Sequence, residues 1–261
     1  MDNTKAIEVK RLSADFKGDG KDLNVLSNIN FTISKGSFNC IIGPSGCGKS
    51  TLFRLLSGLP TRDSCKISGS IRVLGKKPET ASKNREIGLV LQKPTLLEWR
   101  DVQSNIALPL EIMGYTREKQ KEKISKLLNL LDLNEYSEYR PSELSGGMQQ
   151  KVSIGRALAY DPELLLMDEP FGALDEINRR RMNNEIIKIW RKTKKTIVFI
   201  THSIDEAVYL SQKVMVLSKK PSTIHKIINI DLEYPREKEE NSSKYFKYIK
   251  EVRGYLNEAS S

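Results

Sequence analysis

A glycine-rich octapeptide constrains this chain more than any other feature. Residues 43–50 read Gly-Pro-Ser-Gly-Cys-Gly-Lys-Ser; they follow the apolar run 38–42 and precede a helix-like stretch that ends at Gly58. Such a turn lets successive backbone N–H groups converge on phosphate oxygens at a helix N-terminus. In this pattern Lys49 reaches the β- and γ-phosphates and the Ser50 hydroxyl binds Mg²⁺. A glycine turn without a ligand is the alternative, and the flanking strand and helix argue against it.

Strand-like and helix-like segments alternate from end to end, which favours an α/β fold with a largely parallel central sheet. A mainly helical stretch interrupts the alternation and lasts until about residue 160; its clearest periodicity lies at 116–133. We expect one α/β core with an inserted helical subdomain. The expected strands are 7–9, 25–33, 38–42, 71–74, 87–91, 164–167, 196–200, 214–217 and 224–232.

A pair of acids follows a short apolar strand at 164–167. Asp168 is expected to hold Mg²⁺, directly or through water, because hard cations prefer oxygen ligands. Glu169 is the candidate general base that polarises the attacking water. Adjacent acids at a strand end also occur in exposed turns or helix caps. The four apolar residues before them and Pro170 after them favour a buried strand that delivers both acids to a cleft.

The charge balance is strongly basic, with 43 Lys and Arg against 33 Asp and Glu and a formal charge of +10 in 261 residues. Nucleic acid and anionic membrane surfaces are therefore possible partners. The excess is spread over the whole chain, so we expect no nucleic-acid partner. The apolar runs are too short to span a bilayer. Three cysteines (Cys40, Cys47 and Cys65) lack metal-ligand spacing and fit a reducing compartment.

A third motif, Leu-Ser-Gly-Gly-Met-Gln-Gln at 144–150, places Ser145 as the cap of a helix whose glycines leave the first N–H groups accessible to an anion. Together with the phosphate loop and the Asp168-Glu169 strand, it resembles the signature of ABC transporter ATP-binding subunits. The resemblance covers about residues 5–232. It implies a P-loop NTPase (RecA-like) α/β core, with an antiparallel β subdomain and an α-helical subdomain at about 92–160. We expect a nucleotide-binding domain over 1–235 and an amphipathic helical tail over 236–261. Within the tail, the charged run at 236–240 is predicted to be a linker, and Tyr245, Ile249, Val252 and Leu256 are predicted to form an apolar stripe on one side of a helix.

The resemblance also assigns roles to single residues. Phe16 falls where the family stacks an aromatic ring on adenine, although a core aromatic at a strand end is the alternative. Gln92 matches the glutamine that senses Mg²⁺ and links the nucleotide to the membrane subunits. Asp175 belongs to a loop that communicates across the dimer, and His202 matches the switch histidine that contacts the γ-phosphate and orders Glu169. The residues expected to hold ATP are Phe16, Gly43, Pro44, Ser45, Gly46, Cys47, Gly48, Lys49, Ser50, Thr51, Ser145, Gly146 and Gly147; those expected to hold Mg²⁺ are Ser50, Gln92 and Asp168.

The family mechanism implies the partners. Two cassettes sandwich two ATP molecules head to tail, and residues 145–147 of one copy close on the phosphates held by Lys49 of the other. A homodimer would then work with two permease subunits on the cytoplasmic face of the membrane, and with a solute-binding protein through them. Segments 96–100, 171–175 and 201–207 resemble importers of the nitrate/sulfonate/taurine group. Trp99 and Arg100 fall where the family grips the permease; packing of Trp99 between subdomains is the alternative. The ATPase of an exporter, or a soluble cassette acting on nucleic acid or ribosomes, is the alternative function.

Overall fold

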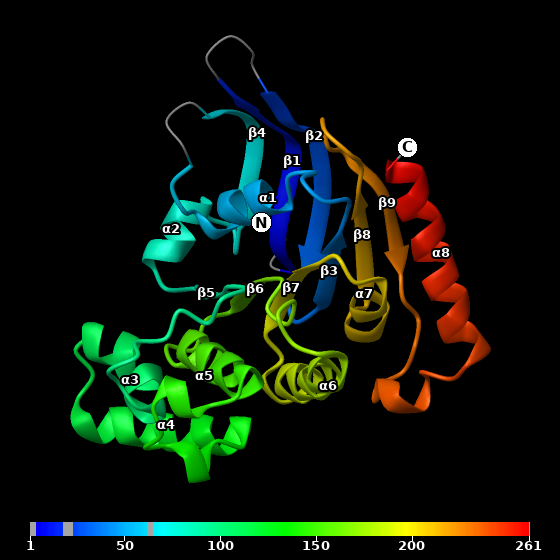
Figure 1. The fold of residues 1–261 in the computed structure, drawn as a ribbon. Coiled ribbons are helices and arrows are strands. Elements are labelled where there is room, and N and C mark those ends of the chain that lie inside the picture. The colour runs from blue at the N-terminus through cyan, green and yellow to red at the C-terminus, as the bar shows by residue number, and fades with distance from the viewer. Residues whose placement is uncertain (1–3, 18–22, 62–64, 261) are drawn as a thin grey trace.

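The computed structural model describes residues 4–17, 23–61 and 65–260, which fold around two sheets (Figure 1). The strands are β1 (Lys5–Phe16), β2 (Leu23–Ser34), β3 (Phe38–Ile42), β4 (Cys65–Val73), β5 (Ile87–Val90), β6 (Leu164–Asp168), β7 (Thr196–Thr201), β8 (Lys213–Leu217) and β9 (Ile224–Asn229). The helices are α1 (Lys49–Ser57), α2 (Pro78–Lys83), α3 (Val102–Ile112), α4 (Arg117–Leu131), α5 (Gly146–Leu158), α6 (Glu176–Thr193), α7 (Ile204–Leu210) and α8 (Ser243–Ser260). Three short 3-10 turns complete the set: η1 (Asn134–Tyr136), η2 (Pro141–Glu143) and η3 (Arg236–Lys238).

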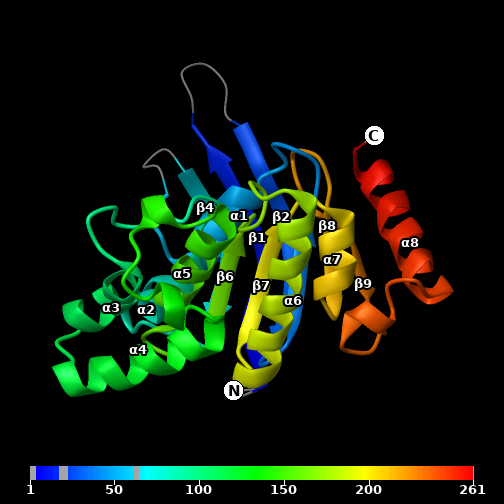
Figure 2. The same cartoon turned by 60° about the horizontal axis from the view of Figure 1, so that its bottom comes forward.

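The central sheet has the strand order β5-β6-β7-β3-β8-β9, and all its neighbours are parallel except β8 and β9. The prediction of a largely parallel sheet is therefore confirmed. Alternation along β3 divides its side chains between two cores: Phe38 and Cys40 belong to one, and Ile41 belongs to the other. Helices α5, α6 and α7 lie over the first face (Figure 2). The parallel strands bring their carboxyl ends to one edge, which is where α/β proteins place their ligands.

A separate three-stranded antiparallel sheet, in the order β2-β1-β4, packs with α1 around the second core. This confirms the expected antiparallel β subdomain. The strands are longer than their sequence patterns predict, since β1 runs to Phe16 and β4 begins at Cys65. The side chains of β4 are exposed over most of its length, so that pairing with β1, rather than apolar alternation, defines this strand.

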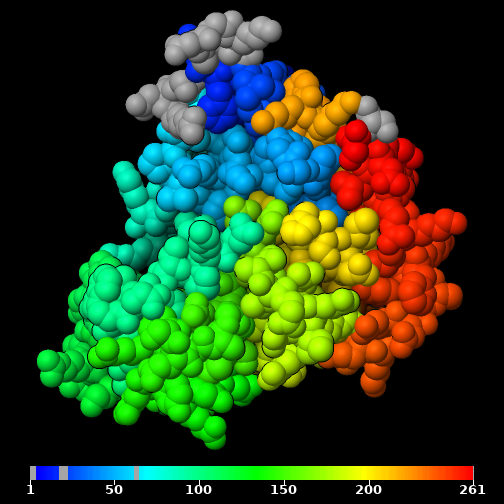
Figure 3. Space-filling view, viewed as in Figure 1, coloured from blue at the N-terminus to red at the C-terminus, as the bar shows by residue number. Residues whose placement is uncertain are grey.

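The inserted helices α3, α4 and α5 form a lobe at the end of the sheet that carries β5 (Figure 3). Buried leucines and isoleucines join the three helices to the first core. A Cβ atom at Gly155 of α5 would lie 2.7 Å from Leu131 and 3.1 Å from Ile106, so the glycine permits the close approach of α5 to α4 and α3. The predicted helical periodicity at 116–133 corresponds to α4, which ends where Asp132 adopts a left-handed conformation.

The C-terminal helix α8 packs against α7, β8 and β9. Tyr245, Ile249 and Val252 are buried and Leu256 is partly buried, so the predicted apolar stripe faces the chain's own core. The charged run at 236–240, which the sequence predicts as a linker, begins instead with a buried residue: Arg236 is fully buried and donates a 2.9 Å hydrogen bond to the Ser211 carbonyl. Within the residues that the structure describes, no helix has the length and apolar character needed to span a membrane.

Candidate active site

The glycine-rich loop connects β3 to α1 at the carboxyl edge of the central sheet. Its glycines are needed for space as well as for conformation, because a Cβ atom at Gly43 would lie 2.8 Å from Cys47 Sγ and 2.9 Å from Leu217 Cβ. Gly48 has φ +111°, a conformation that side chains disfavour. Lys49 is 8% exposed, and its ammonium group donates to the carbonyl oxygens of Gly43 at 2.8 Å and Pro44 at 3.0 Å. The loop therefore curls around its lysine, as the sequence predicts.

The two acids stand at the end of β6, close to this lysine. Burial raises the pKa of the Asp168 carboxyl, the neighbouring charge of Glu169 raises it further, and the Lys49 ammonium opposes both effects. Glu169 has φ +43°, in the left-handed region that a glutamate rarely adopts. Its N–H donates to the Ile200 carbonyl at 2.9 Å, so β7 holds this strained backbone in place.

His202, which the resemblance predicts as the switch histidine, follows the neighbouring strand β7. His202 Nδ1 lies 3.0 Å from Glu169 Oε2, so the adjacent strands β6 and β7 deliver the two side chains to one point. The histidine side chain is 62% exposed, whereas the Glu169 side chain is 23% exposed. The imidazole is therefore accessible from solvent while it touches the carboxylate.

Gln92 follows β5, at the next position along the same edge. A Cβ atom at Gly172 would lie 3.4 Å from Gln92 Nε2 and 3.8 Å from Glu169 Cβ, so the glycine separates the glutamine from the acid. The chain before Gln92 is fixed by Gln150 Nε2, which donates to the Leu91 carbonyl at 3.1 Å. The structure thus brings Gln92 into the neighbourhood of Glu169.

Phe16 ends β1 beside the start of α1. It lines a cavity of about 330 Å³ together with Leu23, Val25, Ser50, Thr51, Arg54, Thr61 and Lys220. Phe16 is half-buried and also touches the second core, so both interpretations of this residue have a structural basis. The cavity leads from an aromatic ring to the Ser50 hydroxyl, the order in which the base and the phosphates of a nucleotide follow each other.

The signature residues lie at the beginning of α5. Ser145 caps this helix by accepting a 3.4 Å hydrogen bond from the N–H of Met148, as predicted. A Cβ atom at Gly146 would meet Leu174 Cδ2 at 3.4 Å, whereas Gly147 faces open space. The next residue after Leu174, Asp175, caps α6 through a 3.0 Å hydrogen bond from the N–H of Asn178, and this hydrogen bond lowers its pKa. The signature and the 172–175 loop thus form a second group beside the one around Lys49.

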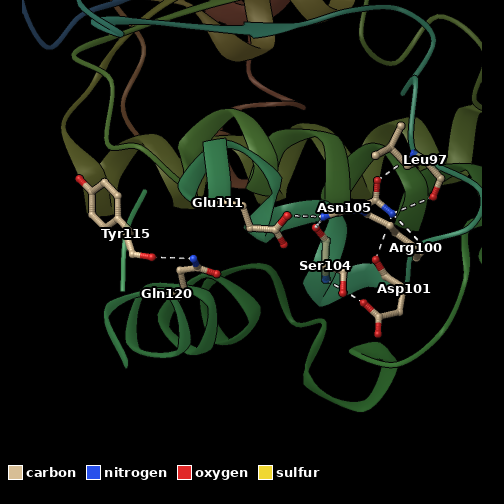
Figure 4. Close-up of polar contacts among 8 residues, drawn as sticks. All are labelled: Leu97, Arg100, Asp101, Ser104, Asn105, Glu111, Tyr115 and Gln120. Atoms are coloured by element: carbon tan, nitrogen blue, oxygen red, sulfur yellow. Dashed lines mark hydrogen bonds and ion pairs between the residues drawn. The ribbon is translucent and has the colours of Figure 1, made fainter. Parts of the chain in front are cut away.

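One polar residue that the sequence did not single out organises the loop before α3. Asn105 is fully buried; its Oδ1 accepts from the N–H of Leu97 at 2.8 Å, and its Nδ2 donates to the carbonyls of Leu97, Arg100 and Asp101 at 3.0–3.1 Å (Figure 4). The same loop exposes Trp99, whose exposed fraction is 73%. The alternative of Trp99 packing between subdomains is therefore wrong. A polar residue directly before the apolar run 106–110 was the available signal.

The donor set suits a magnesium nucleotide. A carboxylate, a hydroxyl and an amide oxygen are hard ligands for Mg²⁺, and the half-buried Asp168 carboxyl is partly desolvated, which a bound cation would offset. The loop supplies converging N–H groups and a lysine, and the Phe16 cavity supplies an aromatic face. Fold and site together define a P-loop nucleotide-binding domain with an inserted helical lobe.

Comparisons with known proteins agree with this class. The ABC transporter family matches residues 26–172. The aliphatic sulfonates import ATP-binding protein SsuB of Bacillus cereus is 40% identical over 90% of this chain and 90% of its own length. The nitrate import ATP-binding protein NrtD of a Synechocystis species is 40% identical over 96% of this chain and 94% of its own. The ATP-binding cassette MJ0796, solved as a dimer in a post-hydrolysis state bound to ADP and Pi, superposes with a TM-score of 0.73 at 27% identity, covering 87% of this chain and 100% of that one. The chain therefore belongs to the ABC transporter family, in which it is the ATP-hydrolysing cassette.

Proposed function

We propose that this chain binds and hydrolyses ATP to energise solute import by a membrane transporter of the nitrate/sulfonate/taurine group. The ATPase assignment rests on one observation. Glu169 contacts His202 at 3.0 Å and directly follows Asp168, which lies close to the phosphate-loop lysine. The relatives that import sulfonates and nitrate support the choice of an importer.

The residues divide the chemistry between them. Lys49 and the loop N–H groups hold the β- and γ-phosphates, and Phe16 stacks on the base. Ser50, Asp168 and Gln92 would hold Mg²⁺, which when bound neutralises the charge that develops on the phosphate oxygens. Glu169 accepts a proton from the attacking water, and His202 keeps the carboxylate oriented toward it.

The two groups of site residues explain why two copies are required. Gly146 adjoins Leu174 and Gly147 faces open space, and the signature has no contact in this chain with the phosphate loop among the contacts described for Gly146 and Gly147. We propose a head-to-tail homodimer in which the signature of each copy closes on the ATP held by the other. The dimeric neighbour of known structure supports this arrangement.

The 97–101 loop is the proposed contact with the permease subunits on the cytoplasmic face of the membrane. An exposed aromatic ring beside a cation is a strong anchor for a partner helix, and here Trp99 precedes Arg100. Arg100 is fixed by a 2.8 Å ion pair with Glu111, and Asn105 fixes the backbone around both residues (Figure 4). The loop therefore presents a preorganised surface.

Two experiments test these proposals. The purified chain should release phosphate from ATP when Mg²⁺ is present and lose this activity with EDTA. A tagged copy should retrieve permease chains from solubilised membranes. Vesicles that contain this complex should take up nitrate or an alkanesulfonate only when ATP is present on the side of the membrane to which this chain is bound. Recovery with ribosomes or DNA and never with a permease would contradict the importer assignment.

A further inference from the structure

Several polar side-chain atoms in the junction between α6 and α7 are buried without a hydrogen-bond partner, and two of them have complementary roles: Glu206 Oε1 on α7 is an acceptor, and Arg179 Nε on α6 is a donor. Glu206 is only 5% exposed. The two helices contact each other beside the central sheet (Figure 2), and both residues line one cavity of about 690 Å³, to which Tyr245 and Phe246 of α8 also contribute. Buried polar atoms without partners are rare and costly, so this pair requires an explanation.

Glu206 holds the backbone on both sides of the switch histidine. Its second carboxylate oxygen accepts a hydrogen bond from the Thr201 hydroxyl, and Thr201 Oγ1 in turn accepts from the N–H of Ser203 at 3.0 Å. Thr201 and Ser203 flank His202 in the chain. We call these two hydrogen bonds the Glu206 clamp. Because they fix the backbone on both sides of His202, the position of the imidazole depends on the Glu206 carboxylate.

Arg179 holds the 172–175 loop, which precedes α6. Its Nη2 donates a 2.7 Å hydrogen bond to the carbonyl of Leu174, the residue before Asp175. Leu174 is also the side chain that lies against Gly146 of the signature. Arg179 therefore fixes the loop between β6 and α6, at the residue that lies against the signature; we call this hydrogen bond the Arg179 clamp.

The two clamps interact through charge. Burial raises the pKa of the Glu206 carboxyl, whereas the hydrogen bond from Thr201 and the charge of the Arg179 guanidinium lower it; His202 also lowers it and Glu169 raises it. The remaining charged groups around the cavity are Glu176, Arg180, Arg181, Asp205 and Glu240. The acceptor on Glu206 and the donor on Arg179 are complementary, and both atoms lack a hydrogen-bond partner.

We propose that Glu206 and Arg179 are positioning residues for ATP hydrolysis, which together couple the 172–175 loop to the orientation of His202. This inference rests on the proposed ATPase function. Movement of the 172–175 loop, which faces the partner copy in the proposed dimer, reaches the histidine through Arg179, Glu206 and Thr201. The pair thereby makes turnover in one site respond to closure of the interface.

The test is a double-mutant cycle in the full-length chain with Glu206→Gln, Arg179→Gln and the double variant. Each single substitution should lower kcat about tenfold and change KM less than about twofold, because the phosphate loop is untouched. The double variant should be no slower than the slower single variant, since both break one linkage. Rates are normalised to the ATP-binding sites measured by titration, and thermal midpoints report the fold.

Matched controls are available on the same two helices. Arg181 and Asp205 are exposed neighbours that line the same cavity, so Arg181→Gln and Asp205→Asn change the same charges without touching either clamp. Both controls should keep the kcat of the unmodified chain. Thr201→Val supplies a second route if Glu206→Gln does not fold, because it removes the bridging hydroxyl at nearly constant volume and should reproduce the loss of kcat.

The outcomes separate the two proposals. Absence of ATP hydrolysis by the unmodified chain would contradict the ATPase function itself. Normal hydrolysis by that chain, with kcat of the Glu206, Arg179 and folded Thr201 variants equal to the controls, would overturn only the positioning roles. Multiplicative losses in the double variant would show two independent effects and would also overturn the coupling.

Discussion

The imidazole of His202 and the carboxylate of Glu169 meet at 3.0 Å although 33 positions separate them in the chain. The contact arises because β6 and β7 are parallel neighbours whose carboxyl ends reach the same edge. Glu169 also carries the positive φ angle of +43°, held by a hydrogen bond to β7. The fold therefore holds Glu169 in a strained backbone conformation in which its carboxylate contacts His202, and such backbone strain is frequent at catalytic positions.

Glu169→Gln should retain ATP binding and lose turnover by a factor of about 10²–10⁴, the usual contribution of a general base. The amide keeps the size of the side chain but cannot accept the proton of water. The measurements are ATP affinity by titration and phosphate release at saturating ATP. Size-exclusion chromatography with ATP should show an accumulated dimer, and hydrolysis at the original rate would exclude Glu169 as the base.

Lys49→Ala should abolish nucleotide binding. The ammonium group occupies the centre of the phosphate loop, where it contacts the carbonyls of Gly43 and Pro44, and no other described cation is bonded there. A fluorescent ATP analogue measures the affinity directly. Lys83→Ala, at the end of α2, is a control of the same chemistry that should bind normally. Tight binding by the Lys49 variant would refute the phosphate assignment.

Trp99→Ala should weaken assembly with the permease subunits without changing ATP hydrolysis by the isolated chain. The side chain is 73% exposed, so its removal should leave the fold and the ATPase rate of the isolated chain unchanged. Recovery of permease subunits by a tagged chain should fall about thirtyfold, the size of a hot-spot loss near 2 kcal/mol. Phe246→Ala on α8, an aromatic that is 57% exposed, is the matched control and should keep the interaction. Equal recovery by both variants would place the contact elsewhere.

The sequence predicted those parts of the molecule that depend on short-range patterns. The phosphate loop and the Ser145 cap each follow from a few consecutive residues, and the structure contains both. The lengths of β1 and β4 were underestimated, because an exposed strand such as β4 is defined by its pairing and carries little apolar alternation. Arg236 was misjudged for a related reason: a charged run indicates solvent unless tertiary contacts bury one member.

The residues that support the site could not be found in the same way. Arg179 and Glu206 are ordinary charged positions on helices α6 and α7, and their importance appears only when the fold brings both helices together. Asn105 differs slightly, since a polar residue next to an apolar helical run suggests burial, but its four hydrogen bonds join three residues of a loop that has no sequence pattern. The pairing of Arg179 with Glu206 depends on the tertiary packing of α6 against α7, and the role of Asn105 depends on the conformation of an irregular loop.

The pKa of Glu206 predicts how stability depends on pH. Burial raises this pKa above the ordinary value of 4.5, so the folded chain holds the proton more tightly than the unfolded chain does. The resulting stabilisation is fully present below pH 4.5, where both states are protonated, and is lost as pH rises through the raised pKa. Urea unfolding of the unmodified chain should therefore show a steeper decline of the unfolding free energy across this window than Glu206→Gln shows, because the raised pKa of Asp168 contributes a decline of the same sign to both proteins. The Asp205→Asn control, at an exposed position, should keep the decline; the same pH dependence in all three proteins would show that Glu206 ionises equally in the folded and unfolded states.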